Sequence, residues 1–290
     1  MSRRSIVLVV LWMMGALLSF SATALGIRGL SASFNVFEIL AMRSLAGLVI
    51  LVTAAMVRRE LRGAIHLNAI GLHAARNLAH FGATYAWTVG VTLLPLATVF
   101  ALEFTAPAWV GLLAVLFLGE RMTAARLVAI VLGFVGVLVI LRPGLAALQP
   151  ASFLVLASAF GFALTAIGTK RLTRTDSTFA ILLFMNLIQL PLNLIGADDR
   201  FWTKLEPGHA LPLAAVCLGG LLSHLCLTNA YRHGDAIMVV PLDFLRIPLI
   251  AAVAWVLYGE PLDPLVLLGS LVIIGGILWS LRAESRPTPA

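Results

Sequence analysis

Apolar runs of about 20 residues, separated by short polar breaks, constrain this chain more than any other feature. A helix needs about 20 mostly apolar residues to cross the hydrocarbon core of a bilayer. Only 11% of the 290 residues are charged, against about 25% in a soluble domain, which is too few to cover a soluble fold. The pattern predicts an all-α integral membrane protein with ten transmembrane helices, over residues 5–27, 35–57, 67–90, 95–118, 123–141, 151–170, 177–196, 210–230, 237–258 and 264–282.

The composition also excludes several other classes of protein. With 61% hydrophobic residues, the chain is too apolar to be disordered. Cys217 and Cys226 both lie inside an apolar run and form no disulfide framework or metal-binding spacing. The net charge of +7 comes from short basic clusters between apolar runs, which is typical of cytoplasmic loops rather than of nucleic-acid binding. We expect no cofactor, no metal and no nucleic-acid partner.

The distribution of positive charge predicts the orientation. With a cytoplasmic N-terminus, thirteen Lys and Arg residues lie at cytoplasmic helix ends: Arg3, Arg4, Arg58, Arg59, Arg62, Arg121, Arg126, Lys170, Arg171, Arg174, Arg232, Arg282 and Arg286. Four lie at outer ends: Arg28, Arg142, Arg200 and Lys204. Both termini are therefore predicted to be cytoplasmic. The first run follows Arg3-Arg4 like a signal peptide, but it lacks a convincing cleavage site and is kept as a helix.

The two halves of the chain resemble each other at an offset of 140 residues. The matches are Leu118-Gly119-Glu120 with Tyr258-Gly259-Glu260, Glu103-Phe104 with Asp243-Phe244, and Gly136 with Gly276. Five spans in each half place the second half upside down relative to the first. We therefore expect inverted five-helix repeats over residues 1–145 and 146–290, an arrangement typical of secondary transporters. Glu120 and Glu260 are expected to be turn and cap residues.

These motifs resemble the EamA type of the drug/metabolite transporter superfamily over nearly the whole chain. The strongest parts run from Pro95-Leu96-Ala97 to Glu103-Phe104-Thr105-Ala106-Pro107, then Leu118-Gly119-Glu120 and Gly133-Phe134-Val135-Gly136-Val137. Arg43 matches a position where the family often has arginine, and residues 73–87 look like a subgroup that includes S-adenosylmethionine carriers. The resemblance implies a ten-helix inner-membrane carrier of small organic molecules, but its motifs mark no substrate. Arg246, three residues after Asp243, departs from the symmetric pattern.

Polar residues inside the spans are the candidate site, because a charge at mid-bilayer costs about 2.5–3.5 kcal/mol. On the third span, polar and aromatic residues recur at three- and four-residue steps and share a face. A basic face with aromatic rings suits an anionic or zwitterionic, partly aromatic substrate. The alternative is a packing stripe that hydrogen-bonds neighbouring helices. The candidate substrate-binding residues are His73, Arg76, Asn77, His80, Tyr85, Trp87, Glu103, Asn186, Gln189, His224, Asn229, Asp243 and Arg246.

The intramembrane acids leave two interpretations open. Glu103 either forms a structural ion pair with Arg43, at a similar depth, or remains unpaired and binds a proton. Asp243 and Arg246 are one turn apart and either pair locally or contact the substrate.

Together these features predict a secondary carrier, not an enzyme, that moves an amino-acid-, vitamin- or nucleoside-like metabolite across the inner membrane by alternating access. No motif for ATP binding or metal-dependent hydrolysis is present. The alternatives are an intramembrane enzyme or a channel that uses the polar face of the third span. The expected partners are the substrate and the lipid bilayer, with the chain as a monomer or homodimer.

Overall fold

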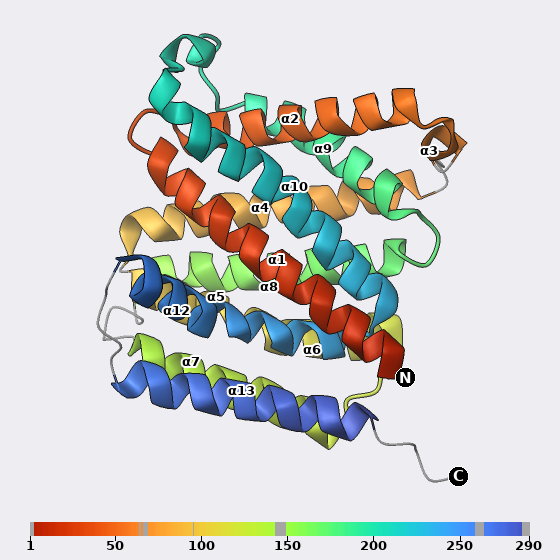
Figure 1. The fold of residues 1–290 in the computed structure, drawn as a ribbon, viewed down its shortest axis with the longest axis vertical. Helices are drawn as coiled ribbons and strands as arrows, with labels where there is room; N and C mark the ends of the chain where they lie inside the picture. The colour runs from red at the N-terminus through yellow and green to blue at the C-terminus, as the bar shows by residue number, and fades with distance from the viewer. Residues whose placement is uncertain are drawn as a thin grey trace. The chain divides into compact units, whose positions relative to one another are not determined.

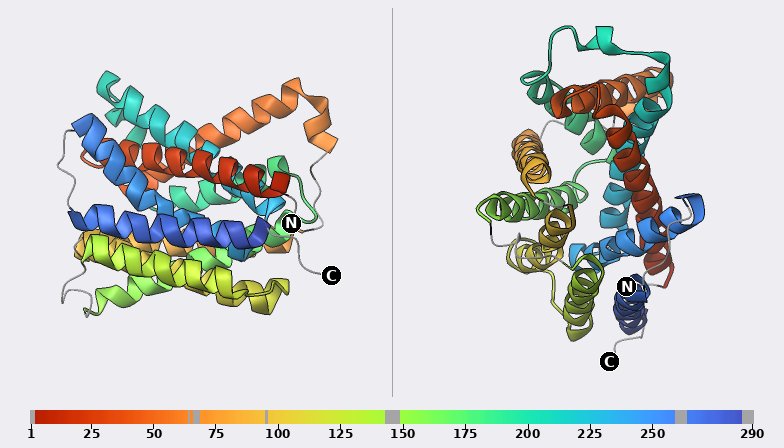
Figure 2. Two further views of the ribbon diagram at one scale, coloured as in Figure 1. Left: turned by 60° about the horizontal axis from the view of Figure 1, so that its bottom comes forward. Right: turned by 90° about the vertical axis from the view of Figure 1, so that its left-hand side faces the viewer.

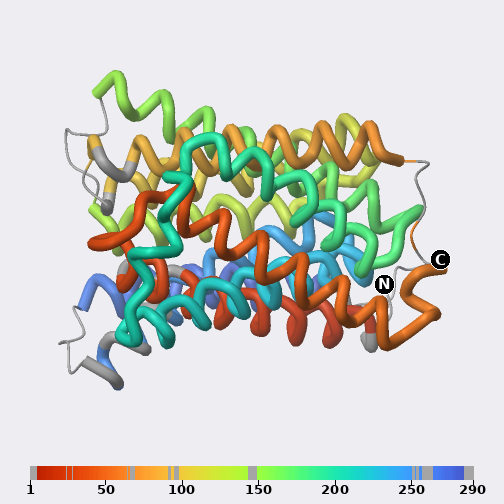
Figure 3. Tube along the Cα trace, turned by 90° about the horizontal axis from the view of Figure 1, so that it is seen from above, coloured from red at the N-terminus to blue at the C-terminus, as the bar shows by residue number. Residues whose placement is uncertain are grey.

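The described chain consists of helices joined by short connections, with no strand among its residues (Figures 1 and 3). This computed structural model describes residues 3–63, 65, 69–94, 96–142, 149–258 and 264–285. The α-helices are α1 (Arg3–Leu30), α2 (Val36–Val57), α3 (Arg59–Gly63), α4 (Ile70–Leu93), α5 (Leu96–Glu103), α6 (Ala106–Leu118), α7 (Ala124–Leu141), α8 (Ala151–Leu172), α9 (Thr178–Leu194), α10 (Ala210–His233), α11 (Ala236–Val239), α12 (Arg246–Tyr258) and α13 (Pro264–Ser285). The 3-10 helices are η2 (Phe201–Lys204), η3 (Pro207–His209) and η4 (Val240–Leu245).

Seven segments of the described chain are helical, long and apolar enough to cross a membrane, and α9 is a shorter apolar helix. Each of the ten expected segments contains at least one helix among its described residues, but a count of ten spans stays a prediction. Two of the expected segments are interrupted. The segment 95–118 breaks between α5 and α6, and 237–258 is divided into α11, η4 and α12. A proline lies at each interruption, in the first turn of α6 and at the start of η4. Because proline has no backbone N–H, it disfavours a continuous helix.

Local sequence signals set several helix ends. Asn35 caps α2: its side chain accepts from the Glu38 N–H, and the Glu38 carboxylate accepts from the Asn35 N–H. Thr123 and Ser177 cap α7 and α9 in the same position. Gly119 ends α6 in the left-handed conformation at φ 68°, which glycine adopts without a steric penalty.

The helices form two compact units. Unit 1 comprises residues 1–11, 82–167 and 233–290, and unit 2 comprises residues 12–81 and 168–232. The boundaries between the units fall within α1, α4, α8 and α10.

In unit 1, α7 and α13 lie side by side and antiparallel (Figures 1 and 2). Glycines permit this close packing. A Cβ on Gly136 would lie 2.7 Å from the carbonyl oxygen of Gly269, and a Cβ on Gly276 would lie 3.0 Å from the Cβ of Leu132. Small residues of this kind let backbones approach inside a membrane, where lipid tails provide no hydrophobic drive between helices.

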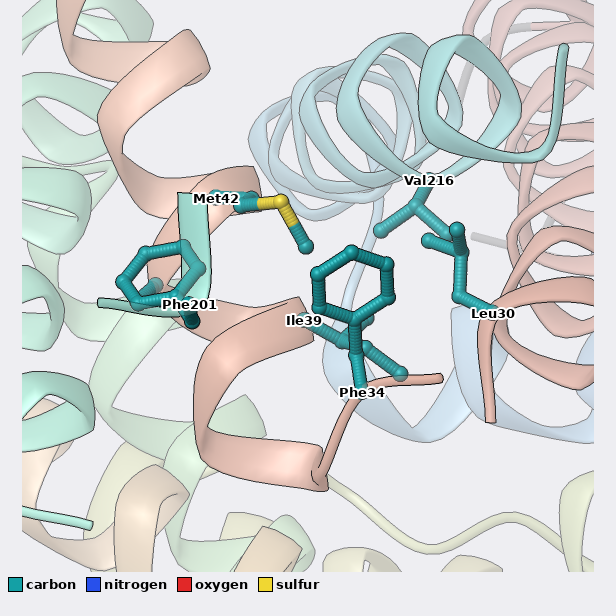
Figure 4. Packing of buried hydrophobic residues seen from close by; sticks show 7 residues of the cluster. Leu30, Phe34, Ile39, Met42, Phe201 and Val216 are labelled. Atoms are coloured by element: carbon teal, nitrogen blue, oxygen red, sulfur yellow. The ribbon is translucent and has the colours of Figure 1, made fainter. Parts of the chain in front are cut away.

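In unit 2, α2 packs antiparallel against α9. Unit 2 also contains a cluster of buried apolar side chains, which Figure 4 shows around Phe34: Leu30, Phe34, Ile39, Met42, Phe201 and Val216. Phe201 belongs to η2 and is 1% exposed. The Lys204 ammonium, also in η2, bonds the buried Glu38 carboxylate at 2.7 Å. These contacts attach the connection between α9 and α10 to the start of α2.

Several sequence expectations fall outside the described residues. These are Pro95, Gly259, Glu260 and the boundary between residues 145 and 146. The assignment of residues 1–145 and 146–290 as repeats stays a prediction.

Candidate functional site

A cluster of charged and aromatic side chains in unit 1 surrounds Arg246, the first residue of α12. Its Nη2 donates to both carboxylate oxygens of Asp243, at 2.7 and 2.5 Å, so the pair expected from their spacing is present. Its Nη1 donates to Glu103 Oε1 at 3.3 Å. The indole Nε1 of Trp87 donates to the other oxygen of Glu103 at 2.7 Å. With all three charged groups ionised, the cluster has one net negative charge.

The cluster brings together residues that the repeat pattern matched. Glu103 and Asp243 bind the same guanidinium. The adjacent Phe104 and Phe244 rings stack with centroids 5.6 Å apart, and the Arg246 guanidinium carbon lies 5.6 Å from the Phe104 centroid. The cluster lies at both helix interruptions, where α5 ends and α12 begins.

The structure assigns Glu103 partners that the sequence interpretation did not name. The hydrogen bonds described for Glu103 come from Trp87 and Arg246, so its unpaired alternative is wrong. Arg43 belongs to unit 2 and Glu103 to unit 1, and the expected ion pair between them stays a prediction.

A second polar cluster lies in unit 2 along α4. His73, Arg76, Asn77 and His80 are buried, with exposed fractions between 0% and 8%. Arg76 donates through Nε to the Thr169 hydroxyl at 3.1 Å and through Nη1 to the Asn77 side-chain oxygen at 2.9 Å. The α4 residues therefore share a face, as their spacing predicts, and that face is directed into unit 2.

The neighbouring helices complete this cluster. Nε2 of Gln189, on α9, donates to the Asn77 carbonyl oxygen at 3.1 Å. The His80 and His224 rings meet edge to face at 5.4 Å. Electrostatic interaction links these two histidines with Arg43 and Arg76. The cluster thus draws side chains from α2, α4, α8, α9 and α10.

Three other candidate residues have surroundings of their own. The Asn186 amide bonds the Leu182 carbonyl of its own helix. Asn229 bonds the Leu225 carbonyl and accepts from the Thr178 hydroxyl. Tyr85 is 52% exposed.

Asp176 is a member of the α4 network that the sequence analysis missed. It lies in the turn between α8 and α9 and is 4% exposed. Its Oδ1 lies 3.3 Å from His73 Nε2, and its other oxygen accepts from Thr175. Asp176 follows a polar stretch and reads as a loop residue, and the sequence gives no signal of a partner 103 positions away.

Glu120 is a cap residue, as expected, but it caps a distant helix. Its two carboxylate oxygens accept from the backbone N–H groups of Ala236 and Ile237, at 2.9 and 3.0 Å, at the start of α11. Arg126 bonds Asp235 beside it at 2.9 Å. Among the described residues, no group of three His, Cys, Asp or Glu side chains could hold a metal ion.

Apolar helices of membrane-spanning length, with charged side chains buried among them, are typical of a multi-pass membrane transporter. The chain belongs to the EamA-like transporter family, whose model matches it twice, at residues 7–142 and 149–282. It is therefore a transporter of the drug/metabolite superfamily rather than an enzyme.

Curated relatives carry small-metabolite names. A riboflavin transporter of Rhizobium johnstonii is 33% identical over 69% of this chain and 67% of its own length. A second, from Brucella anthropi, is 27% identical over 82% of this chain and 86% of its own. An S-adenosylmethionine uptake transporter of Rickettsia felis is 25% identical over 95% and 92%. These similarities support a small-metabolite transporter.

The fold of this chain also matches that of a solved crystal structure. It covers 96% of this chain and 99% of its own chain with a TM-score of 0.77. Its sequence identity is 17%, so the likeness concerns the fold alone.

Proposed function

We propose that the chain is a secondary carrier of the plasma membrane that moves a small heteroaromatic metabolite, of the riboflavin or S-adenosylmethionine kind, by alternating access. The observation that carries this proposal is the buried polar face of α4, with His73, Arg76, Asn77 and His80 inside a bundle of apolar helices. Burying such groups in a membrane protein is costly, so intramembrane ionisable residues are candidates for a functional site. The substrate is proposed to be anionic or zwitterionic, because this face is basic.

The proposal includes two inverted five-helix repeats, residues 1–145 and 146–290, with both termini cytoplasmic. The meeting of Glu103-Phe104 with Asp243-Phe244 around Arg246 supports the repeats. Repeats of this kind meet at broken helices near the middle of the membrane, where transporters bind substrates and ions. We propose that the Arg246 cluster is the charged centre of unit 1, and that α4 provides the substrate contacts of unit 2.

Reconstituted transport tests this function. Purified protein in proteoliposomes should show saturable uptake of labelled riboflavin or S-adenosylmethionine, and the same unlabelled compound on the opposite side should stimulate it. Flux that rises linearly with concentration, without stimulation from the opposite side, would indicate a channel. Absence of flux for both compounds would refute the proposed substrate class.

Arg76→Ala tests whether the α4 face belongs to the site. We expect it to reduce counterflow about ten- to a hundredfold, because a hydrogen bond to a charged group contributes about 1.5–3 kcal/mol. Leu78→Ala is the matched control, since Leu78 lies on the same helix with 56% of its surface exposed. Equal transport by the two folded variants would show that the polar face serves packing only.

A further inference from the structure

We propose that Arg43 and Arg76 form a two-arginine subsite in unit 2 that binds the anionic group, a carboxylate or a phosphate, of the transported metabolite. This inference rests on the carrier function proposed above and specifies the chemistry at one point of the site. It also gives Arg43 a role other than an ion pair with Glu103.

The two arginines come from different helices, α2 and α4, but they are linked through α10. The Arg43 stem packs on Gly220 of α10. One turn further along α10, the His224 ring meets the ring of His80, which lies one turn after Arg76 on α4, at a centroid distance of 5.4 Å. Electrostatic interaction between Arg43 and Arg76 agrees with this placement. Two guanidinium groups repel each other, and the repulsion grows as water is removed. An anion bound between the two guanidinium groups would offset this repulsion. A site that holds both groups in a membrane interior is therefore suited to binding an anion.

Glycines form a slot for each arginine. A Cβ on Gly220 of α10 would lie 2.5 Å from Cδ of Arg43 and 2.9 Å from Cγ. A Cβ on Gly168 of α8 would lie 3.0 Å from both Cβ and Cγ of Arg76. Each arginine stem thus lies directly on a helix backbone, and this packing fixes the direction of the charged head.

The counter-charge for this pair is missing among the described residues. Arg76 bonds two neutral acceptors, Thr169 and Asn77, and no described residue accepts a hydrogen bond from Arg43. Asp176, the acid that reaches the α4 stripe, bonds His73 and Thr175.

Two other arginines of the helical bundle provide a contrast. Arg246 has Asp243 and Glu103 as carboxylate partners, and Arg126 has Asp235. Arg43 and Arg76 form no ion pair with a described acid. A carboxylate or phosphate from the substrate would provide the missing partner, because both accept paired hydrogen bonds from guanidinium.

Two pairs of compounds test this subsite in the purified full-length protein. S-adenosylhomocysteine has a carboxylate that methylthioadenosine lacks, and flavin mononucleotide has a phosphate that riboflavin lacks. Dissociation constants come from titrating the apparent melting temperature, since a ligand that binds the folded state raises it. We expect the anionic member of at least one pair to bind about tenfold more tightly, and the responding pair separates carboxylate from phosphate.

Arg43→Gln should abolish this preference while leaving the affinity for the anion-free member unchanged. Arg43→Lys should restore part of it, and Arg59→Gln, at an exposed arginine, should leave it intact. A preference that survives in Arg43→Gln would overturn the proposal, and so would the absence of any preference in the wild-type protein together with no stabilisation by inorganic phosphate or acetate.

Gly220→Ala provides a second variant that keeps both arginines. The added methyl group would displace the Arg43 stem, so the variant should lose the anion preference as Arg43→Gln does. Gly71→Ala is the control, because nothing lies within 4 Å of its added Cβ. An unchanged preference in Gly220→Ala would count against the slot and the subsite.

The outcomes separate this inference from the carrier function. If riboflavin or S-adenosylmethionine is transported, but no anion preference is found and neither phosphate nor acetate stabilises the wild-type protein, the subsite is wrong and the carrier stands. If neither compound is transported, but phosphate or acetate stabilises the wild-type protein and not Arg43→Gln, the subsite stands and the proposed substrate class is wrong.

Discussion

Intramembrane arginines of this chain occupy two kinds of environment. Arg246 has carboxylates from both matched motifs within hydrogen-bonding distance, whereas Arg43 and Arg76 have no ion pair with a described acid. Removing one partner of a buried ion pair is costly, because the remaining charge loses its compensation. Replacing Arg246 by a neutral residue should therefore lower the stability of the folded protein, because its carboxylate partners would stay behind. Replacing Arg43 or Arg76 would leave no described carboxylate without its cation.

Arg246→Gln should lower the stability of the folded protein by about 3 kcal/mol, the lower end for a buried pair, since its side chain is partly exposed. Two carboxylates would then face each other without a cation. The loss should appear as a lower apparent melting temperature in detergent. Adding Asp243→Asn to Arg246→Gln should restore part of the stability, and a double variant no more stable than the single one would contradict this account.

Gly133→Ala should also destabilise the protein, because a Cβ at that position would clash with the Phe244 ring. Overpacking of this kind typically costs about 1–3 kcal/mol. Gly71→Ala, whose Cβ meets nothing within 4 Å, should leave stability unchanged or raise it slightly. Equal melting temperatures for the two variants would show that the Phe244 ring moves aside without cost.

In unit 1, the end of one helix is hydrogen-bonded to the start of another helix that is distant in the sequence. Glu120, just after α6, satisfies two backbone N–H groups at the start of α11, which have no partner within their own helix. The left-handed Gly119 directs the chain toward this contact. The Gly-Glu motif therefore works as a turn followed by a cap for another helix.

Glu120→Ala should destabilise the protein by about 0.5–2 kcal/mol, the range measured for loss of a capping side chain. Glu120→Gln should cost less, because its amide oxygen can still accept one of the two hydrogen bonds. Both changes should lower the apparent melting temperature while leaving the substrate dissociation constant unaltered. A large change in substrate affinity for folded Glu120→Gln would place Glu120 in the binding site instead.

Both termini of the chain are predicted to be cytoplasmic, since positive charge gathers at one set of helix ends. Single cysteines in a background lacking Cys217 and Cys226 test this. With an impermeant maleimide in intact cells, Thr203→Cys and Leu262→Cys should be labelled and Arg121→Cys should be protected until the cells are opened. The reverse pattern would invert the assignment.

Much of the fold follows from local sequence. Apolar length, Asn35 as a cap with Glu38, and Gly119 at the end of α6 are local signals, because they act within one helix turn. The three- and four-residue spacing of His73, Arg76 and His80 placed them on one face for the same reason. The match of Glu103-Phe104 with Asp243-Phe244 required comparison of distant segments, but it is still visible in the sequence.

Hydropathy, charge distribution and helical spacing were thus sufficient for the membrane class, the transporter family, most of the helical segments and the shared face of His73, Arg76 and His80. Which charges are partners depends on the tertiary structure: Arg246 with Glu103, His73 with Asp176, and Glu120 with the start of α11. It also placed Gly220 beneath Arg43. The difference arises because hydropathy and helical periodicity depend on residues that are close together in the sequence. Ion pairs and glycine contacts depend instead on how helices far apart in the sequence pack together.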